Sequence, residues 1–247
     1  MAQKYSNEFL AIGAGARAQG MGNSSVASSS DAYSPYWNPA GMAGVESNMQ
    51  LAFMHAEWFA GVGNYDYLSL VYPIYSEKKD KRRAFGISAI RFGVDDIPNT
   101  LSLYADDGTV DYNNITSFSS ADYAFLLSYA QDYWMGDNRK LFIGGNAKVI
   151  YRNIGSFAKA VGFGFDLGAQ FHLKNVSFGL TAKDLTNTFN AWNFSFTEEE
   201  KETLAITNNE IPINSLEVTR PWFILGSAYH KRFGKFGMLT ELDFRLT

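Results

Sequence analysis

Histidines and clustered acids are the side chains of this sequence that could do chemistry. His55, His172 and His230 lie far apart along the chain, and cysteine is absent. Without thiols there are no disulfides and no thiolate metal sites. Histidines this scattered favour lumen or interface positions over a shared metal site.

One acidic stretch offers oxygen ligands, because Asp106, Asp107 and Asp111 lie close to Gly108. A calcium loop needs acids at regular odd positions and a final Glu, which this stretch lacks. We interpret it as a solvated loop. Nucleophile-elbow, phosphate-loop and H-E-x-x-H motifs are also absent from the sequence. We therefore expect no catalytic residue, no metal and no cofactor, and a protein that is not an enzyme.

The composition bounds the class of protein. The chain has 247 residues, 14 Tyr, 20 Phe and a formal net charge of −4. Such an aromatic bias fits the girdles of a membrane β-barrel, although a soluble β-sandwich can share it. No apolar run approaches the ~20 residues of a transmembrane helix, which excludes a helical membrane protein. Mild acidity does not support a nucleic-acid partner.

The elements that would position these side chains begin with an irregular segment, residues 1–46. Four glycines between residues 13 and 22 are too closely spaced for a stable helix. Pro35 and Pro39 each remove an amide donor. Such a segment keeps one shape only if something encloses it. We predict that it forms a hatch inside a barrel formed by residues 47–247; the alternative is a surface loop ahead of a soluble β-domain.

Alternating apolar and polar residues follow, and they predict nine strands. Val149 and Tyr151, for example, face one way, while Lys148 and Arg152 face the other. An apolar outside with a polar inside is typical of a transmembrane barrel; a sandwich has the same period, and enclosure of the hatch favours the barrel. The predicted strands are Met49–Trp58, Tyr65–Tyr75, Ala84–Val94, Asp122–Gln131, Arg139–Asn153, 163–172, Val176–Asp184, Pro221–Arg232 and Phe236–Leu246.

The connections set the orientation of this barrel. Two long ones, 95–119 and 185–220, are expected on the outer side, and the charged run 77–83 in a solvated periplasmic turn. Thr197 and Glu200 form a capping-box pattern that predicts a short helix to about Ile206. Nine is an odd number, whereas bacterial barrels close with an even one, so we expect further strands beyond Thr247.

The N-terminal segment resembles a known family. The pattern GARAQGMG…VASSSDA…YWNPAGMA, within residues 7–43, is similar to the PorV/PorQ family of the type IX secretion system of Bacteroidota. That family lies within the FadL-like outer-membrane barrels. The resemblance implies a fourteen-stranded, all-β transmembrane barrel in the bacterial outer membrane. It implies hatch roles for Arg17, Gly20, Gly22, Trp37, Asn38, Pro39, Ala40 and Gly41.

Three functions remain open. By resemblance to PorV, the chain would bind the signal domain of secreted cargo and a large translocon barrel. By resemblance to FadL, it would be a channel for hydrophobic molecules, with Asn38-Pro39-Ala40 moving to admit the ligand. The residues around this tripeptide depart from PorV proper, which favours a PorV-like subunit of another outer-membrane complex.

The outer loops are the expected docking surface, because long loops on a rigid scaffold commonly bind partners. Aromatic residues are enriched at interfaces. The alternative is that these side chains pack on their own barrel rim. The expected docking residues are Leu103, Tyr104, Tyr112, Phe118, Phe189, Trp192, Phe194 and Phe196.

Two expectations concern packing. Polar backbone groups of the hatch should bond to inward charged residues, since unpaired groups would cost several kcal/mol. The expected partners are Lys148, Arg152, Asp166 and Lys183. Arginine should be costly at the outward positions Val149, Phe165 and Leu180, and milder at the lumen positions Asn146 and Thr181.

Overall fold

The alternating pattern folds most of the chain into one antiparallel sheet. The computed structural model describes residues 6–46, 48–76, 81–103, 109–136 and 138–246. Nine strands follow the order β1-β2-β3-β4-β5-β6-β7-β10-β11, and two short strands lie off this path: β8 pairs with β6, and β9 pairs with β8. The strands are β1 (Gln50–Trp58), β2 (Gly63–Ser76), β3 (Lys81–Asn99), β4 (Thr116–Gly136), β5 (Arg139–Ile154), β6 (Ala158–Leu173), β7 (Val176–Lys183), β8 (Phe189–Phe194), β9 (Ser215–Val218), β10 (Trp222–Phe233) and β11 (Phe236–Leu246).

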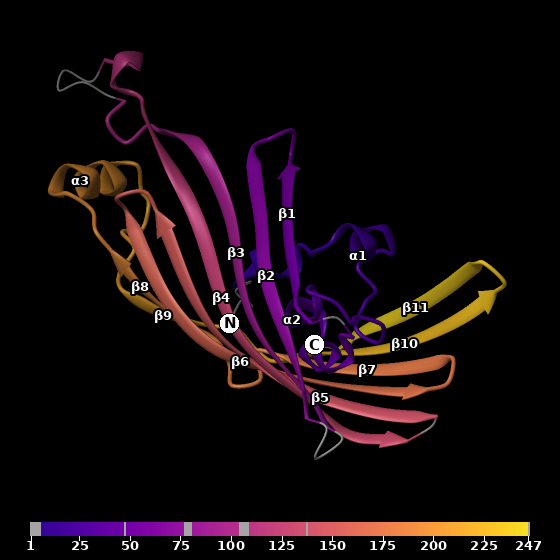
Figure 1. Ribbon diagram of the computed structural model, residues 1–247. Coiled ribbons are helices and arrows are strands. Elements are labelled where there is room, and N and C mark those ends of the chain that lie inside the picture. Colours follow the sequence, from indigo (N-terminus) through magenta and orange to yellow (C-terminus); the bar gives the residue numbers. More distant parts are fainter. Residues whose placement is uncertain (1–5, 47, 77–80, 104–108, 137, 247) are drawn as a thin grey trace.

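The sheet curls into a half-barrel, and the N-terminal segment lies within its curve (Figure 1). This arrangement confirms the expected all-β antiparallel fold. No helix among the described residues is long and apolar enough to cross a membrane. The helical turns are η1 (Glu8–Ala11), α1 (Ala16–Gly20), α2 (Ser34–Trp37) and η2 (Pro39–Gly44) in the N-terminal segment, and η4 (Tyr112–Asn114) and α3 (Glu198–Ile206) in the two long connections.

The two faces of the sheet differ as the alternation predicts. Val149, Phe165 and Leu180 point outward and remain exposed, whereas Asn146 and Thr181 point inward and are buried. The outer face is therefore apolar over most of its width. The inner face is the core of the molecule, because the N-terminal segment packs against it.

The first long connection is shorter than expected. β3 continues to Asn99 and β4 begins at Thr116, so much of the region 95–119 is strand rather than loop. The register shifts between Val94 and Ile97, where Asp96 has a positive φ of 56°. A β-bulge there lets the acidic residues remain in the strand. This part of the strand was not predicted because its composition is typical of a loop.

The second long connection is also partly sheet. The expected capping box is confirmed: Thr197 accepts from the Glu200 amide and α3 ends at Ile206. β8 and β9, however, were not predicted. β8 continues the line of β7 along β6 after an interruption at residues 184–188. β9 likewise precedes β10, with residues 219–221 between them. Both strands are shorter than the blocks that alternation reveals.

The connections sort to the two ends of the sheet as expected from strict alternation. The β3–β4 connection and the insertion with α3 lie at one end (Figure 1, upper left). The β10–β11 turn lies at the other end (right). We call these the long-loop end and the short-turn end.

Candidate functional site

The N-terminal segment is held against the inner face of the sheet at a site that we call the seat. This site is centred on the side chain of Asn38, which is fully buried. Its Nδ2 donates to the carbonyls of Val26 (2.9 Å), Ala169 (3.0 Å) and Leu180 (3.4 Å). Its Oδ1 accepts from the Ala40 amide at 3.1 Å. One side chain thus joins two turns of the segment to β6 and β7. Extended geometry at Asn38, followed by a proline, starts the η2 turn.

Other side chains of the curved sheet, which we call the wall, also donate hydrogen bonds to carbonyl oxygens of the segment. They come from the inward positions of β5, β6 and β7, and all are uncharged amides or hydroxyls. Buried carbonyls need such donors, because an unsatisfied polar group is costly. The bonds run from Asn146 Nδ2 to Pro35 (2.8 Å), from Thr181 Oγ1 to Trp37 (3.1 Å), and from Gln170 Nε2 to Val26 and Ser29 (both 3.0 Å).

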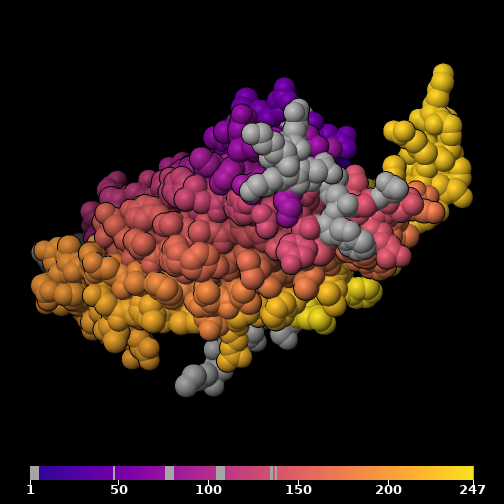
Figure 2. All heavy atoms as spheres, turned by 60° about the horizontal axis from the view of Figure 1, so that its bottom comes forward, coloured from indigo at the N-terminus to yellow at the C-terminus, as the bar shows by residue number. Residues whose placement is uncertain are grey.

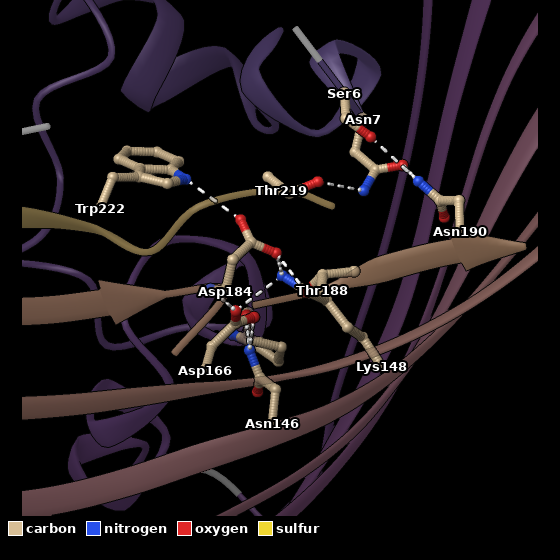
Figure 3. A network of polar contacts seen from close by, with 11 residues as sticks. Ser6, Asn7, Asn146, Lys148, Asp166, Asp184, Thr188, Asn190, Thr219 and Trp222 are labelled. Carbon is tan, nitrogen blue, oxygen red and sulfur yellow. Dashed lines mark hydrogen bonds and ion pairs between the residues drawn. The ribbon is translucent and has the colours of Figure 1, made fainter. Parts of the chain in front are cut away.

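Some of the charged residues that were expected to bind the segment form ion pairs within the wall instead. Lys148 Nζ lies 2.7 Å from Asp166 and 2.5 Å from Asp184, and all three are buried. Thr188 Oγ1 donates to Asp184 at 2.6 Å, and Trp222 Nε1 donates to it at 3.1 Å (Figure 3). The cluster therefore holds the wall where β7 gives way to β8.

The other two expected partners also make different contacts. Lys183 Nζ lies 4.5 Å from the ring centre of Tyr36, which is a cation–π contact with the segment. Arg152 Nε donates to Asp122 at 2.8 Å, within the wall. The expected bonds from these charged residues to the hatch backbone are thus wrong. A charge costs less to bury beside another charge than beside a carbonyl alone.

Glycines let the segment press on the backbone of the wall. Gly144, Gly168 and Gly179 occupy inward positions on β5, β6 and β7. A Cβ at Gly144 would lie 2.6 Å from the Pro39 carbonyl carbon. One at Gly168 would collide with the Asn38 amide oxygen. Sequence reasoning missed these residues, although glycines at inward positions of long strands were a usable signal.

Two carboxylates of β11 hold the other side of the segment. Asp243 Oδ2 accepts from the amides of Ser25 (2.9 Å) and Val26 (3.1 Å). Glu241 Oε1 accepts from the Ala27 amide at 2.6 Å. Carboxylates facing successive amides make strong, charge-assisted hydrogen bonds. This role was not predicted from the sequence.

Aromatic side chains of α2 hold the chain at η1 and between η1 and α1. The Tyr36 hydroxyl accepts from the Gly13 amide at 2.8 Å and donates to the Leu10 carbonyl at 2.7 Å. Trp37 Nε1 donates to the Ala14 carbonyl at 2.8 Å. Burial raises the pKa of the Tyr36 hydroxyl to about 12, so it remains a neutral donor.

The remaining hatch residues lie in two settings. Pro39, Ala40 and Gly41 are buried in η2. A Cβ at Gly41 would collide with the Ser29 carbonyl. Arg17, in contrast, is exposed and forms a long ion pair with Asp31 (3.8 Å).

Gly20 and Gly22 also lie at the exposed end of the segment. Each would have open space around an added Cβ. Gly22 has a positive φ of 66°, which favours glycine, but Gly20 does not. Nothing in the structure explains Gly20.

Four of the expected docking residues pack on the rim of the barrel itself. Phe118, Phe157, Phe196, Phe194 and Trp192 form a continuous stack, with successive ring centres 5.0, 5.8, 6.3 and 5.8 Å apart. Trp192 is buried. These side chains therefore pack against one another as the alternative expects, while docking through them stays a prediction.

The other expected docking residues are scattered. Phe189 is on the outward face of β8, opposite Phe163 of β6. Tyr112 is exposed in η4, and Leu103 is half-buried. Tyr104 lies outside the described residues, as do Asp106 and Asp107.

The histidines lie on three different strands. His55 Nδ1 is 2.7 Å from Asp66 Oδ1 on the outer face, and His172 Nδ1 is 2.8 Å from Ser177 Oγ. His230 is exposed on β10. Across the described ranges no group of three or more His, Asp or Glu is placed to hold a metal ion.

Comparison with known proteins now bears on this arrangement. The profile of the family described as "Type IX secretion system protein PorV" matches residues 3–184, which is 182 of the 247 residues. The chain belongs to the PorV family. The PorV match covers the N-terminal segment and β1 to β7, and so includes Asn38 and most of its seat. No curated protein matches the chain significantly.

Membership of the PorV family makes the chain a component of a type IX secretion system. An antiparallel half-barrel with an apolar outer face and an enclosed polar interior fits an outer-membrane protein. The β11 carboxylates and the insertion with α3 lie outside the PorV match.

Proposed function

We propose that this chain is a non-enzymatic outer-membrane subunit of the type IX secretion machinery. Its long-loop end docks the signal domain of secreted cargo or a large translocon barrel. The observation that carries this proposal is a set of apolar side chains left exposed outside the strands at that end. Ile206, Ile213 and Tyr112 are 85%, 78% and 75% exposed.

These residues differ from the aromatic stack, which packs on itself. Ile206 ends α3, and Ile213 lies between α3 and β9, in an insertion whose two ends are joined by the pairing of β8 with β9. Large apolar side chains that remain exposed are typical of interaction sites. The docking residues are therefore the aliphatics of the insertion rather than its aromatics.

The alternative function, a channel opened by movement of Asn38-Pro39-Ala40, fits the seat poorly. Asn38 alone makes four hydrogen bonds, and the wall glycines leave no clearance beside Pro39. Moving this tripeptide would break the wall contacts of β5, β6 and β7 together. A fixed plug supports a scaffold function.

The test is co-purification from native membranes. Residues 198–211 are replaced by a short glycine–serine linker, which keeps β8, β9 and Phe196. We expect loss of the translocon or cargo partner with normal membrane insertion, and the same from I206S/I213S. The matched control is E210Q, a polar change in the same exposed connection. Full partner recovery by both loop variants would overturn the docking proposal.

A further inference from the structure

The tip of the β10–β11 hairpin has an unusual sequence for a turn. Residues 231–236 read Lys-Arg-Phe-Gly-Lys-Phe and contain no acidic residue. Gly234 closes the turn with φ 60°, and Phe233 pairs with Phe236 across it. The two rings are 51% and 79% exposed. In Figure 2 the yellow hairpin stands away from the body of the molecule at the upper right.

Further bases lie beside this tip. The His230 amide donates to the Asn175 carbonyl at 2.8 Å, which brings the β6–β7 turn and its exposed Lys174 against β10. We call Lys174, Lys231, Arg232 and Lys235 the basic collar. Among the described residues no carboxylate lies within ion-pair distance of these four.

The opposite end of the molecule has the opposite charge. Residues 185–220 contain six acidic and two basic residues, a net charge of −4. The whole chain has 25 acidic and 21 basic residues, so the remainder has nineteen of each sign. All of the net negative charge therefore belongs to the long-loop insertion, and positive charge gathers at the short turns.

The collar also borders the apolar outer face. Along β11, Met238, Leu242 and Phe244 are exposed and follow Phe236 at even spacing. The apolar surface therefore reaches the hairpin tip, with Thr240 as a polar position on β11 between Met238 and Leu242. Aromatic rings beside lysine and arginine at the edge of an apolar band are typical of a membrane interface. Lysine and arginine near a surface attract anionic lipids.

We propose that the basic collar binds the phosphate headgroups of anionic phospholipids in the leaflet at the short-turn end, with Phe233 and Phe236 seated at the interface. This inference rests on the proposed outer-membrane location. A bilayer fits better than an acidic protein, because both rings continue the outer apolar face. The tip then fixes the depth of the sheet in the bilayer, and the acidic insertion stays in water.

Native mass spectrometry of the detergent-solubilised full chain tests this binding, with phosphatidylglycerol and phosphatidylcholine as probes. We expect preferential retention of phosphatidylglycerol. K231Q/K235Q should weaken it by about fivefold for each base removed. The charge-matched control is K159Q/K201Q, which removes two bases elsewhere and should leave retention unchanged. F233S/F236S should keep the lipid preference but slow insertion into vesicles.

The outcomes separate this inference from the proposed function. Equal retention of the two lipids, or equal losses in the two lysine pairs, would overturn the collar. Selective binding of an acidic periplasmic protein without lipid preference would also overturn it. Failure of the chain to insert into any bilayer would instead overturn the outer-membrane location. Insertion without lipid preference leaves that location intact and removes only the collar.

Discussion

The two halves of the N-terminal segment are held in different ways. The rear half, residues 24–45, contains fully buried Val26, Asn38 and Ala40 and lies against the glycines of the wall. The front half, residues 6–23, also has buried residues such as Phe9 and Ala14, but it ends in a mostly exposed helix whose Arg17 contacts Ser28 and Asp31 at the surface. The rear half is therefore fixed to the barrel wall by many contacts. The front half, which has fewer contacts with the wall, covers the rear half.

This difference indicates where the lumen could open. Freeing the rear half requires the loss of hydrogen bonds to β5, β6, β7 and β11 together. Asn7 in the front half donates to Thr219 at 3.1 Å and accepts from Asn190 at 3.0 Å (Figure 3). Local opening starts where few such contacts are made. The front half would therefore move first.

The largest effect is expected from filling the space between wall and segment. Gly144→Val places side-chain atoms where the Pro39 backbone lies, so we expect the free energy of unfolding to fall by more than about 3 kcal/mol. Gly20→Ala in the front half meets nothing and should be neutral. Urea unfolding followed by gel mobility measures both. Equal midpoints would mean that the two halves are held alike.

Removing the central amide should cost somewhat less. Asn38→Ala removes the partner of the Ala40 amide and one of the two donors to the Val26 carbonyl, which keeps its bond from Gln170, so we expect the free energy of unfolding to fall by about 2–3 kcal/mol. Asn7→Ala removes a partly buried bond to Thr219 and a buried bond from Asn190, whose amide keeps Ser6 as a partner, so the free energy of unfolding should fall by about 1 kcal/mol. The same unfolding assay ranks them. A larger loss at Asn7 would reverse our assignment of the fixed half.

The smallest effect is expected at Arg17. Its ion pair with Asp31 is exposed and 3.8 Å long, and such pairs contribute less than about 1 kcal/mol. Arg17→Gln should therefore leave unfolding almost unchanged. It should however raise proteolytic cleavage within residues 16–23 if the front half is the mobile cover. Stable resistance to protease in this variant would argue that the front half is also fixed.

Much of the sheet could be predicted from the sequence. Alternation placed Val149 outward and Asn146 inward, because one residue of register exchanges the two faces. The density of glycine and proline indicated a segment that needs enclosure. β8 and β9 were not predicted, because strands of six and four residues contain too few alternations of apolar and polar residues to detect.

The contacts of the seat could not be predicted, and the reason is physical. Sequence identifies a lumen position but not whether water or packed chain fills the lumen. Asn146 and Thr181 are buried and bonded to the segment, so arginine there should not be milder than on the lipid face. Trp192 shows the same limit, because aromatic residues are enriched both in packed rims and at interfaces.

The β11 carboxylates have a consequence for the order of folding. The bond between Ser25 and Asp243 joins residues 218 positions apart, and that between Ala27 and Glu241 joins residues 214 apart. Contacts this distant in sequence form slowly, because a long loop must close first. The contacts of residues 25–27 are therefore completed only after β11 has formed. Before β11 forms, residues 24–45 lie beside an incomplete sheet, and their backbone amides are exposed to other hydrogen-bond acceptors.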